Sequence, residues 1–391
     1  QGVDVPRLLR DIEAVCAYQM QFWGDVPFTH YDFMLLITQN GYGGLEHTHS
    51  TALIASPEHL PRLNHTHQAQ KYAELLGLMS HEYFHAWNVK RLRPAAFTQT
   101  DYHQEHYTEL LWFFEGFTAY YDDLCLLRTG LLDAQGYLDG MAKTATALQR
   151  SPGRQVQSLA ESSFDAWIKF YRADENAPNS QVSYYGKGSL VAWLLDVHLR
   201  AQGQSLDGLM RRLWQNYAHQ PLTEEGLEAA MSRLTGLDLS VFFAAYIQGC
   251  VELPLASALQ QIGVACQWRP AQNSQDKGGW VDAPKPSLDL GVRWVADGAG
   301  IKMTHVLRSG AAECAGWQVG DVLLSLAGLQ VGAAHFDVLL QGLSADKFLP
   351  FALMRRGHLV QGDITPSLAI ADTCGLRVDD NKAFARWAQA V

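Results

Sequence analysis

The 391-residue sequence lacks any apolar run close to the roughly 18 residues that a helix needs to cross a bilayer, so no transmembrane segment is expected. Basic residues are in the minority, with 30 Lys and Arg against 40 Asp and Glu. The resulting net charge of -10 argues against a nucleic-acid-binding surface. No CxxC pair occurs among the six cysteines, so a disulfide framework is not expected and a soluble protein of a reducing, cytoplasmic compartment is favoured.

The amino terminus offers neither an initiator Met nor the charged and apolar segments of a signal peptide. We therefore expect the chain to begin part-way through a longer gene product. The length and the 48% content of apolar residues suit a globular protein of two or three domains.

Hydrophobic periodicity changes along the chain. Residues 5–24 have helical spacing, residues 31–37 and 50–54 are typical of strands, and residues 70–258 are mainly helical. After a stretch rich in Pro, Gly, Asn and Ser, short strands alternate with tight turns, and a last helix is expected over 381–390.

These patterns predict an α+β multidomain protein whose mainly helical domain precedes a small β-rich domain. The predicted parts are an N-terminal lobe of helix and sheet (1–75), a helical lobe (76–267), a linker (268–287), the β-rich domain (288–366) and a C-terminal tail with a short helix (367–391).

His81, Glu82 and His85 form an HExxH motif in a stretch expected to be helical as far as Pro94. Residues four apart lie on one face of a helix, so both histidines can bind one metal ion with Glu82 beside them as a general base. A shuffled sequence of this composition would contain the motif about 0.02 times, which makes chance a poor explanation. We predict one zinc ion here. The basic run at 90–93 is interpreted as charge that complements the helix dipole.

A catalytic zinc site needs a third protein ligand. Glu115 is a lone carboxylate in the apolar segment LWFFEGFTAYY, where an unpaired buried charge would be costly and a metal ion would compensate it. Asp122 lies two helical turns further along the same face. It is a candidate acceptor for the free N–H of a ligating histidine, with a surface carboxylate as the alternative.

HExxH followed by LWFFEGFTAYY resembles the gluzincin metallopeptidases, in which the Glu of an xEGF segment is the third zinc ligand. The longer string HEYFHAWNVKRLRP is similar to the glycyl aminopeptidase family of bacterial enzymes, and the resemblance covers most of residues 5–365. It implies a thermolysin-like catalytic domain, a PDZ domain, and an N-terminal β-rich domain that would precede residue 1. The gap from His85 to Glu115 exceeds that of the aminopeptidase N family, which keeps Glu105 as a rival ligand.

The resemblance also implies substrate-binding residues. Gly43, Gly44 and Glu46 lie in GGLEH, which matches the family's exopeptidase motif and assigns the substrate ammonium to Glu46; a turn whose Glu faces water is the alternative. The segment YYGKG is similar to the Tyr-x-Lys-Gly segment whose tyrosine stabilises the oxyanion. That similarity selects Tyr185, with Tyr184 in reserve, against two tyrosines that only pack at a helix start.

Three segments of the β-rich part, LDLGV, SGAA and GWQVGDVL, resemble a bacterial PDZ domain. Such domains bind an extended C-terminal peptide by strand addition. The alternative is a groove filled by the protein's own chain.

Together these features lead us to expect a zinc-dependent aminopeptidase that removes small N-terminal residues such as Gly or Ala from peptides. Two alternatives remain. One is a zinc endopeptidase, in which Glu46 would bind no amine. The other is a non-catalytic PDZ peptide-binding protein with a structural zinc, against which the presence of Glu82 argues.

Overall fold

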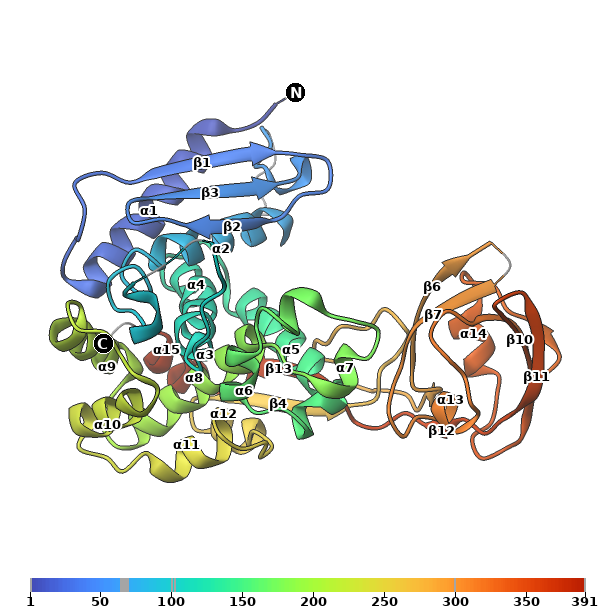
Figure 1. Ribbon diagram of the computed structural model, residues 1–391. Helices are drawn as coiled ribbons and strands as arrows, with labels where there is room; N and C mark the ends of the chain where they lie inside the picture. Colours follow the sequence, from blue (N-terminus) through green and yellow to red (C-terminus); the bar gives the residue numbers. More distant parts are fainter. Residues whose placement is uncertain (1, 64–69, 100, 102, 299, 390–391) are drawn as a thin grey trace.

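The computed structural model describes residues 2–389 apart from 64–69, 100, 102 and 299. An N-terminal sheet, a central helical region and a C-terminal sheet follow one another along the chain (Figure 1). The predicted α+β architecture is confirmed.

The N-terminal part is a three-stranded sheet with helices on one face. Its elements are α1 (Val5–Trp23), β1 (Asp32–Ile37), β2 (Gly43–Glu46) and β3 (Ser50–Ala55). Strand β3 lies in the centre, parallel to β1 and antiparallel to β2. Leu53 and Ala55 of β3 pack with Val15 of α1 and with Leu76 and Met79 of the next helix. Because the strand order is β1-β3-β2, strand β2 lies at an edge of the sheet, on the side of the following helix, residues 70–84.

The helical region contains the largest core. Its elements are η1 (Pro57–His59), α2 (Gln70–Phe84), η2 (Ala95–Phe97), α3 (Leu111–Phe114), α4 (Gly116–Arg128), α5 (Ala134–Gln149), η3 (Pro152–Gln155), α6 (Leu159–Phe164), η4 (Phe170–Arg172), α7 (Ala177–Ser180), α8 (Tyr184–Ala201), α9 (Leu206–Tyr217), α10 (Glu224–Thr235), α11 (Ser240–Tyr246) and α12 (Leu255–Gln260). Large aromatic side chains fill the space between helices; for example, Phe84 stacks on Tyr121 with ring centroids 5.2 Å apart.

Helix α2 ends at Phe84, so the expectation of a helix as far as Pro94 is wrong. Beyond it the amide of Lys90 donates to the carbonyl of His85 and that of Leu92 to Trp87, which are wider turns than α-helical ones. Trp87 is fully buried and stacks on Trp23, so tertiary packing outweighs helix propensity in this stretch. The basic run consequently does not lie at a helix C-terminus.

The expected continuous helix around Glu115 is broken at that residue, between α3 and α4. The carbonyl oxygen of Phe114 accepts hydrogen bonds from the side chains of Thr118 and Asn88. Such side-chain donors compete with the backbone ladder of a helix. Glu115 is therefore presented at a junction between two helical segments.

The C-terminal sheet has a hydrophobic core of its own. It is formed by β6 (Val292–Asp297), β7 (Gly300–Val306), β8 (Val322–Leu326), β10 (Leu349–Arg355) and β11 (His358–Ile364) in the order β11-β10-β8-β7-β6. Helices α13 (Ala311–Cys314) and α14 (Phe336–Gln341), strand β9 (Leu329–Gln330) and the pair β5 (Leu288–Asp289) with β12 (Ser367–Leu368) complete it. Ile301, Leu323 and Leu353 are fully buried in this core.

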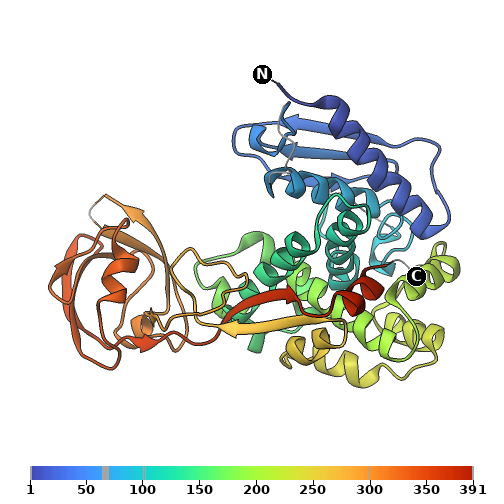
Figure 2. The same ribbon diagram turned by 180° about the vertical axis from the view of Figure 1, so that it is seen from behind.

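The end of the chain returns to the helical region (Figure 2). Strand β13 (Thr373–Val378) pairs antiparallel with β4 (Val264–Arg269), and α15 (Asn381–Ala388) follows. Indole Nε1 of Trp387 donates to Asp196 of α8 at 2.9 Å. The helix predicted over 381–390 is present as far as Ala388, and Ala390 lies outside the described residues. Within the part of the chain that the structure describes, no helix is long and apolar enough to cross a membrane.

Candidate active site

The two histidines of the HExxH motif converge on one carboxylate oxygen. Nε2 of His81 lies 3.2 Å and Nε2 of His85 3.3 Å from Oε2 of Glu115. The ligand atoms that these three residues offer lie within 4.8 Å of one another. Two imidazoles and a carboxylate are the donor set of a catalytic zinc site, so the residues present fit such an ion.

Each imidazole has a separate partner for its other nitrogen. Nδ1 of His81 is 2.9 Å from Oδ2 of Asp122, and Nδ1 of His85 is 2.8 Å from the carbonyl oxygen of Asn88. Buried Asn88 in turn donates to Oγ1 of Thr118 at 3.2 Å. These acceptors orient both rings so that Nε2 is left for a metal ion.

Charges inside the group oppose the effect of burial. Burial by itself disfavours the charged form of His81, but the neighbouring Asp122 and Glu115 raise its pKa. Burial disfavours the charged form of Glu115 as well and by itself would raise its pKa. The neighbouring His85 and His81 nevertheless hold the pKa of Glu115 well below its usual range. A carboxylate that stays ionised between two imidazoles is suited to binding a cation.

Glu82 lies against the edge strand β2. Its side chain is 5% exposed, and Oε2 has no hydrogen-bond partner among the described residues. Burial raises the pKa of Glu82, although the charges of His85 and His81 oppose that rise. A Cβ atom on Gly44 would lie 2.2 Å from Oε1 of Glu82, so only glycine allows this close approach.

Glu46, at the end of β2, lies in the same group of side chains. Ligand atoms of Glu46, Glu82 and His85 lie within 4.8 Å of one another. Oε1 of Glu46 is 2.9 Å from Nζ of Lys90, and the Glu46 side chain is 20% exposed. Gly43 begins β2 opposite Ile54 of β3. The structure thus places Glu46 beside the HExxH motif and not in open solvent.

Tyr184 begins α8, and Tyr185 follows it in the first turn of that helix. The ring centroid of Tyr185 is 6.1 Å from that of His81, and its hydroxyl is 3.2 Å from the hydroxyl of Tyr171. Tyr184 is 1% exposed and its hydroxyl donates to Tyr171 at 3.4 Å. Burial and the charge of Glu115 raise the pKa of Tyr185 well above its usual range, so its hydroxyl stays a donor.

Two glycines set how closely α8 approaches the Glu115 junction. A Cβ atom on Gly116 would lie 2.5 Å from Cα of Gly188, so neither position accommodates a side chain without movement of a backbone. This contact brings the start of α8 toward Glu115.

Glu105, the rival ligand, does not join the histidines. Its side chain is 43% exposed and its Oε1 lies 3.5 Å from Nη2 of Arg172. It belongs to neither group of potential metal ligands found in the described part of the chain.

Three residues near the site make contacts that the sequence does not predict. Asn88 was expected inside a helix, where its carbonyl would have bonded within that helix. Tyr171 lies in the short η4 segment, for which the sequence carried no functional signal. Lys90 was interpreted only as a charge near a helix end.

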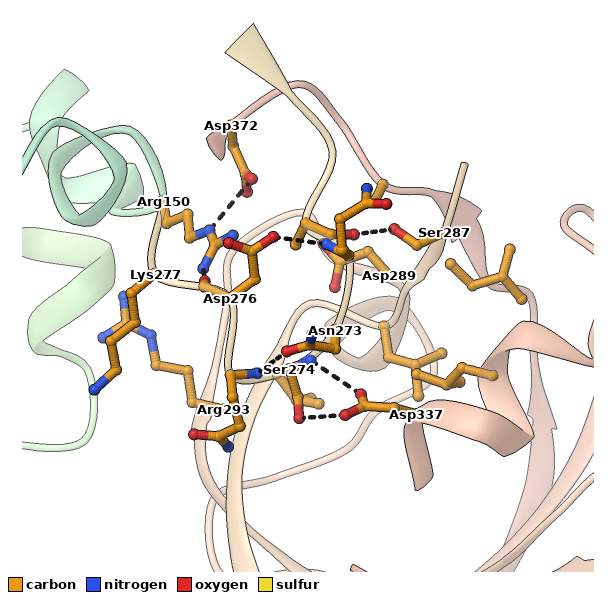
Figure 3. Close-up of a pocket in the computed structure, with 18 of the residues that line it drawn as sticks. Arg150, Asn273, Ser274, Asp276, Lys277, Ser287, Asp289, Arg293, Asp337 and Asp372 are labelled. Carbon is orange, nitrogen blue, oxygen red and sulfur yellow. Dashed lines mark hydrogen bonds and ion pairs between the residues drawn. The ribbon is translucent and has the colours of Figure 1, made fainter. Parts of the chain in front are cut away.

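A hollow of about 510 Å³ lies away from the HExxH motif, between α5 and the C-terminal sheet (Figure 3). Much of its apolar lining comes from β6, α14 and the residues before β6, while Lys143 of α5 and Arg150, which follows that helix, also line it. Ser274 borders it, with its amide 3.0 Å from Oδ1 and its hydroxyl 2.9 Å from Oδ2 of Asp337 at the start of α14.

A model of the M61 glycyl aminopeptidase family matches residues 74–191, which contain the HExxH motif, Glu115 and Tyr185. The crystal structure of an aminopeptidase N family protein from Idiomarina loihiensis is similar to the whole chain, with 31% identity and a TM-score of 0.95. The alignment covers 100% of this chain and 67% of that chain. This chain belongs to the glycyl aminopeptidase family. The family predicted from HEYFHAWNVKRLRP is thereby confirmed, and it supports a peptidase acting on peptide substrates.

The other similar structures match only a small part of this chain. The serine endoprotease from Yersinia pestis has 23% identity over 22% of this chain and 31% of that chain, with a TM-score of 0.20. An HtrA3 PDZ domain bound to a phage-derived ligand has 16% identity over 23% of this chain and 91% of that chain, also at 0.20. Scores this low support no conclusion. No curated protein matches the chain.

Proposed function

We propose that this member of the glycyl aminopeptidase family is a zinc-dependent aminopeptidase of the gluzincin type with a thermolysin-like catalytic domain. The observation that carries the proposal is the overlap of two groups at His85. One group is His81, His85 and Glu115, and the other is His85, Glu82 and Glu46. A potential metal site, a general base and a carboxylate for an ammonium group thus share one place. A structural zinc needs no adjacent base, and an endopeptidase needs no amine anchor.

In this proposal each side chain of the site has a separate role in hydrolysis. A zinc ion held by His81, His85 and Glu115 would supply Lewis acidity to water and to the substrate carbonyl. Glu82 accepts a proton from the attacking water and passes it to the leaving amine, for which its raised pKa is suited. Tyr185 donates a hydrogen bond to the developing oxyanion, with Tyr184 as the reserve.

The substrate is a peptide with a free, small N-terminal residue such as Gly or Ala. Strand β2 supports this because it is an edge strand, which an extended peptide can join by backbone hydrogen bonds. Gly43 and Gly44 leave its surface without side chains next to Glu82. Glu46, at the end of the same strand, holds the substrate ammonium.

We further propose that the parts 1–75, 76–267, 268–287, 288–366 and 367–391 are the two catalytic lobes, a linker, a PDZ domain and the tail. The hollow between β6 and α14 supports a peptide groove there. Fluorescence anisotropy with labelled peptides ending in a free or an amidated carboxyl group tests it. Equal binding of the two forms would contradict a C-terminal peptide ligand.

The experiment that tests the activity uses the full chain. Metal content is measured, the metal is removed with a chelator and zinc is returned, and hydrolysis of Gly-, Ala- and Leu-anilides is followed. We expect activity to be lost and restored, and Glu82→Gln to lower kcat by about 10²–10⁴-fold. Glu225→Gln, an exposed carboxylate on α10, is the control. Hydrolysis that survives in Glu82→Gln would overturn the mechanism.

Glu46→Gln separates the aminopeptidase from the endopeptidase. We expect a loss of about 10–100-fold in kcat/KM on free-amine substrates, because a charged partner of the ammonium is removed, and little change on N-acetylated peptides. An equal loss on both substrates would show that Glu46 is not an amine anchor.

A further inference from the structure

Lys90 already occupies the place proposed for the ammonium group of the substrate. Its Nζ is 2.9 Å from Oε1 of Glu46, and the side chains of Lys90 and Glu46 are 28% and 20% exposed. We infer that Lys90 is an internal competitor for the amine anchor, which the α-ammonium of a substrate has to displace. The inference rests on the proposed function of Glu46.

The backbone of Lys90 is held by a hydrogen bond, whereas its side chain has several rotatable bonds. Its amide donates to the carbonyl of His85 at 3.0 Å, which ties Lys90 to a proposed metal ligand. The four-carbon stem of a lysine carries a compact charge through several rotatable bonds. Lys90 can therefore release Glu46 without any change in the residues around the metal site.

The neighbouring Arg91 already performs the structural task that the ion pair could have served. Its guanidinium donates to the carbonyls of Thr48 at 2.5 Å, Ala86 at 2.8 Å and Pro27 at 2.8 Å. The bonds to Thr48 and Pro27 fasten segment 85–93 to the β2–β3 turn and to the chain before β1. Among the described residues, the carboxylate within ion-pair distance of Lys90 is that of Glu46.

The ion pair between Lys90 and Glu46 would favour ligands with a free amine over ligands with a blocked amine. A substrate with a free amine replaces one cation on Glu46 by another, so the carboxylate is never left unpaired next to Glu82. A peptide with a blocked amine brings no replacement, and Lys90 stays across the anchor. Specificity is a difference between affinities: every ligand that reaches Glu46 has to break the ion pair with Lys90, and only a ligand with an ammonium group replaces it.

The test compares Lys90→Met, which keeps the stem and removes the charge, with Lys90→Arg, which keeps a cation. KM and kcat are measured on Ala-anilide, and binding of alaninamide is measured by titration calorimetry. We expect Lys90→Met to lower KM and to tighten alaninamide binding by about fivefold, the scale of a partly exposed ion pair, while kcat shifts less than KM. Lys90→Arg stays near the wild type, as does Lys302→Met, an exposed lysine on β7.

A second background shows whether the effect runs through Glu46. In Glu46→Gln, the further change Lys90→Met should alter neither KM nor alaninamide binding, because the pair is already gone. An unchanged or raised KM in Lys90→Met, or the same shift in the Glu46→Gln background, would overturn the inference. A wild-type zinc enzyme inactive on every free-amine substrate would instead overturn the proposed function, and this inference with it. If the wild type is active and Lys90→Met changes neither KM nor alaninamide binding, the inference about Lys90 is wrong and the proposed function stands.

Discussion

The candidate active site has a buried half and an open half, and they are built differently. In the buried half, His81 and His85 each have one partner that orients the ring, and Glu115 lies between them. In the open half, Glu46 and Tyr185 are held by other side chains whose own ends are partly exposed. The difference teaches that the side chains of the buried half are held in one arrangement, as the proposed metal site requires, whereas the proposed substrate has room to rearrange those of the open half.

The largest expected effect lies in the buried half. Glu115→Gln removes the anionic ligand and should weaken zinc binding by about 10³-fold, a share of the roughly 10–16 kcal/mol that a four-ligand zinc site gains. Zinc affinity measured by competition with a chromophoric chelator checks this. Glu105→Gln, the matched control, should bind zinc as the wild type does. If only the Glu105 variant loses zinc, Glu105 and not Glu115 is the third zinc ligand.

In the open half, Tyr185→Phe should reduce kcat by about 10²-fold, because one hydrogen bond to the oxyanion is lost. Zinc content should not change, since the phenol binds no metal in this scheme. Steady-state kinetics beside metal analysis distinguishes the two halves. Tyr184→Phe is the control, and a larger loss in that variant would reassign the oxyanion role.

A smaller effect is expected from Asp122→Asn, which removes the charged acceptor of His81. Zinc affinity should fall by about 10-fold, in the range for residues that orient a ligand. Competition with the same chelator checks this, with Asp139→Asn on the surface of α5 as the control. An unchanged affinity would mean that the bond to His81 does not orient the ligand.

The smallest effect is expected from Tyr171→Phe. It removes one hydroxyl that contacts both Tyr184 and Tyr185, and kcat should fall by no more than about threefold. Equal activity in the wild type and the variant would agree with the assignment of Tyr171 to a supporting position in the open half. A loss as large as that of Tyr185→Phe would instead place Tyr171 in direct contact with the reaction.

Much of the fold was predictable because its signals are local. Helical spacing over residues 5–24 located α1 to within one residue, and the change from helical spacing to short strands and tight turns located the C-terminal sheet. The breaks at Phe84 and Glu115 were not predictable, because contacts from distant segments cause them. Trp87 packs on Trp23, and Asn88 reaches Phe114. The pairing of β4 with β13 joins segments about a hundred residues apart and left no local pattern.

The sequence by itself determined the HExxH spacing, the lone carboxylate at Glu115 and the family, because these depend on residue type and on intervals within one or two helical turns. Only the tertiary structure decided that Asn88 orients His85, that Tyr171 meets Tyr185 and that Lys90 pairs with Glu46. The contact of Lys90 with Glu46 joins the helical region to the N-terminal sheet, and the contact of Tyr171 with Tyr185 forms where the chain before α8 folds back onto that helix. Such contacts depend on the packing of the whole chain, which no short stretch of sequence encodes.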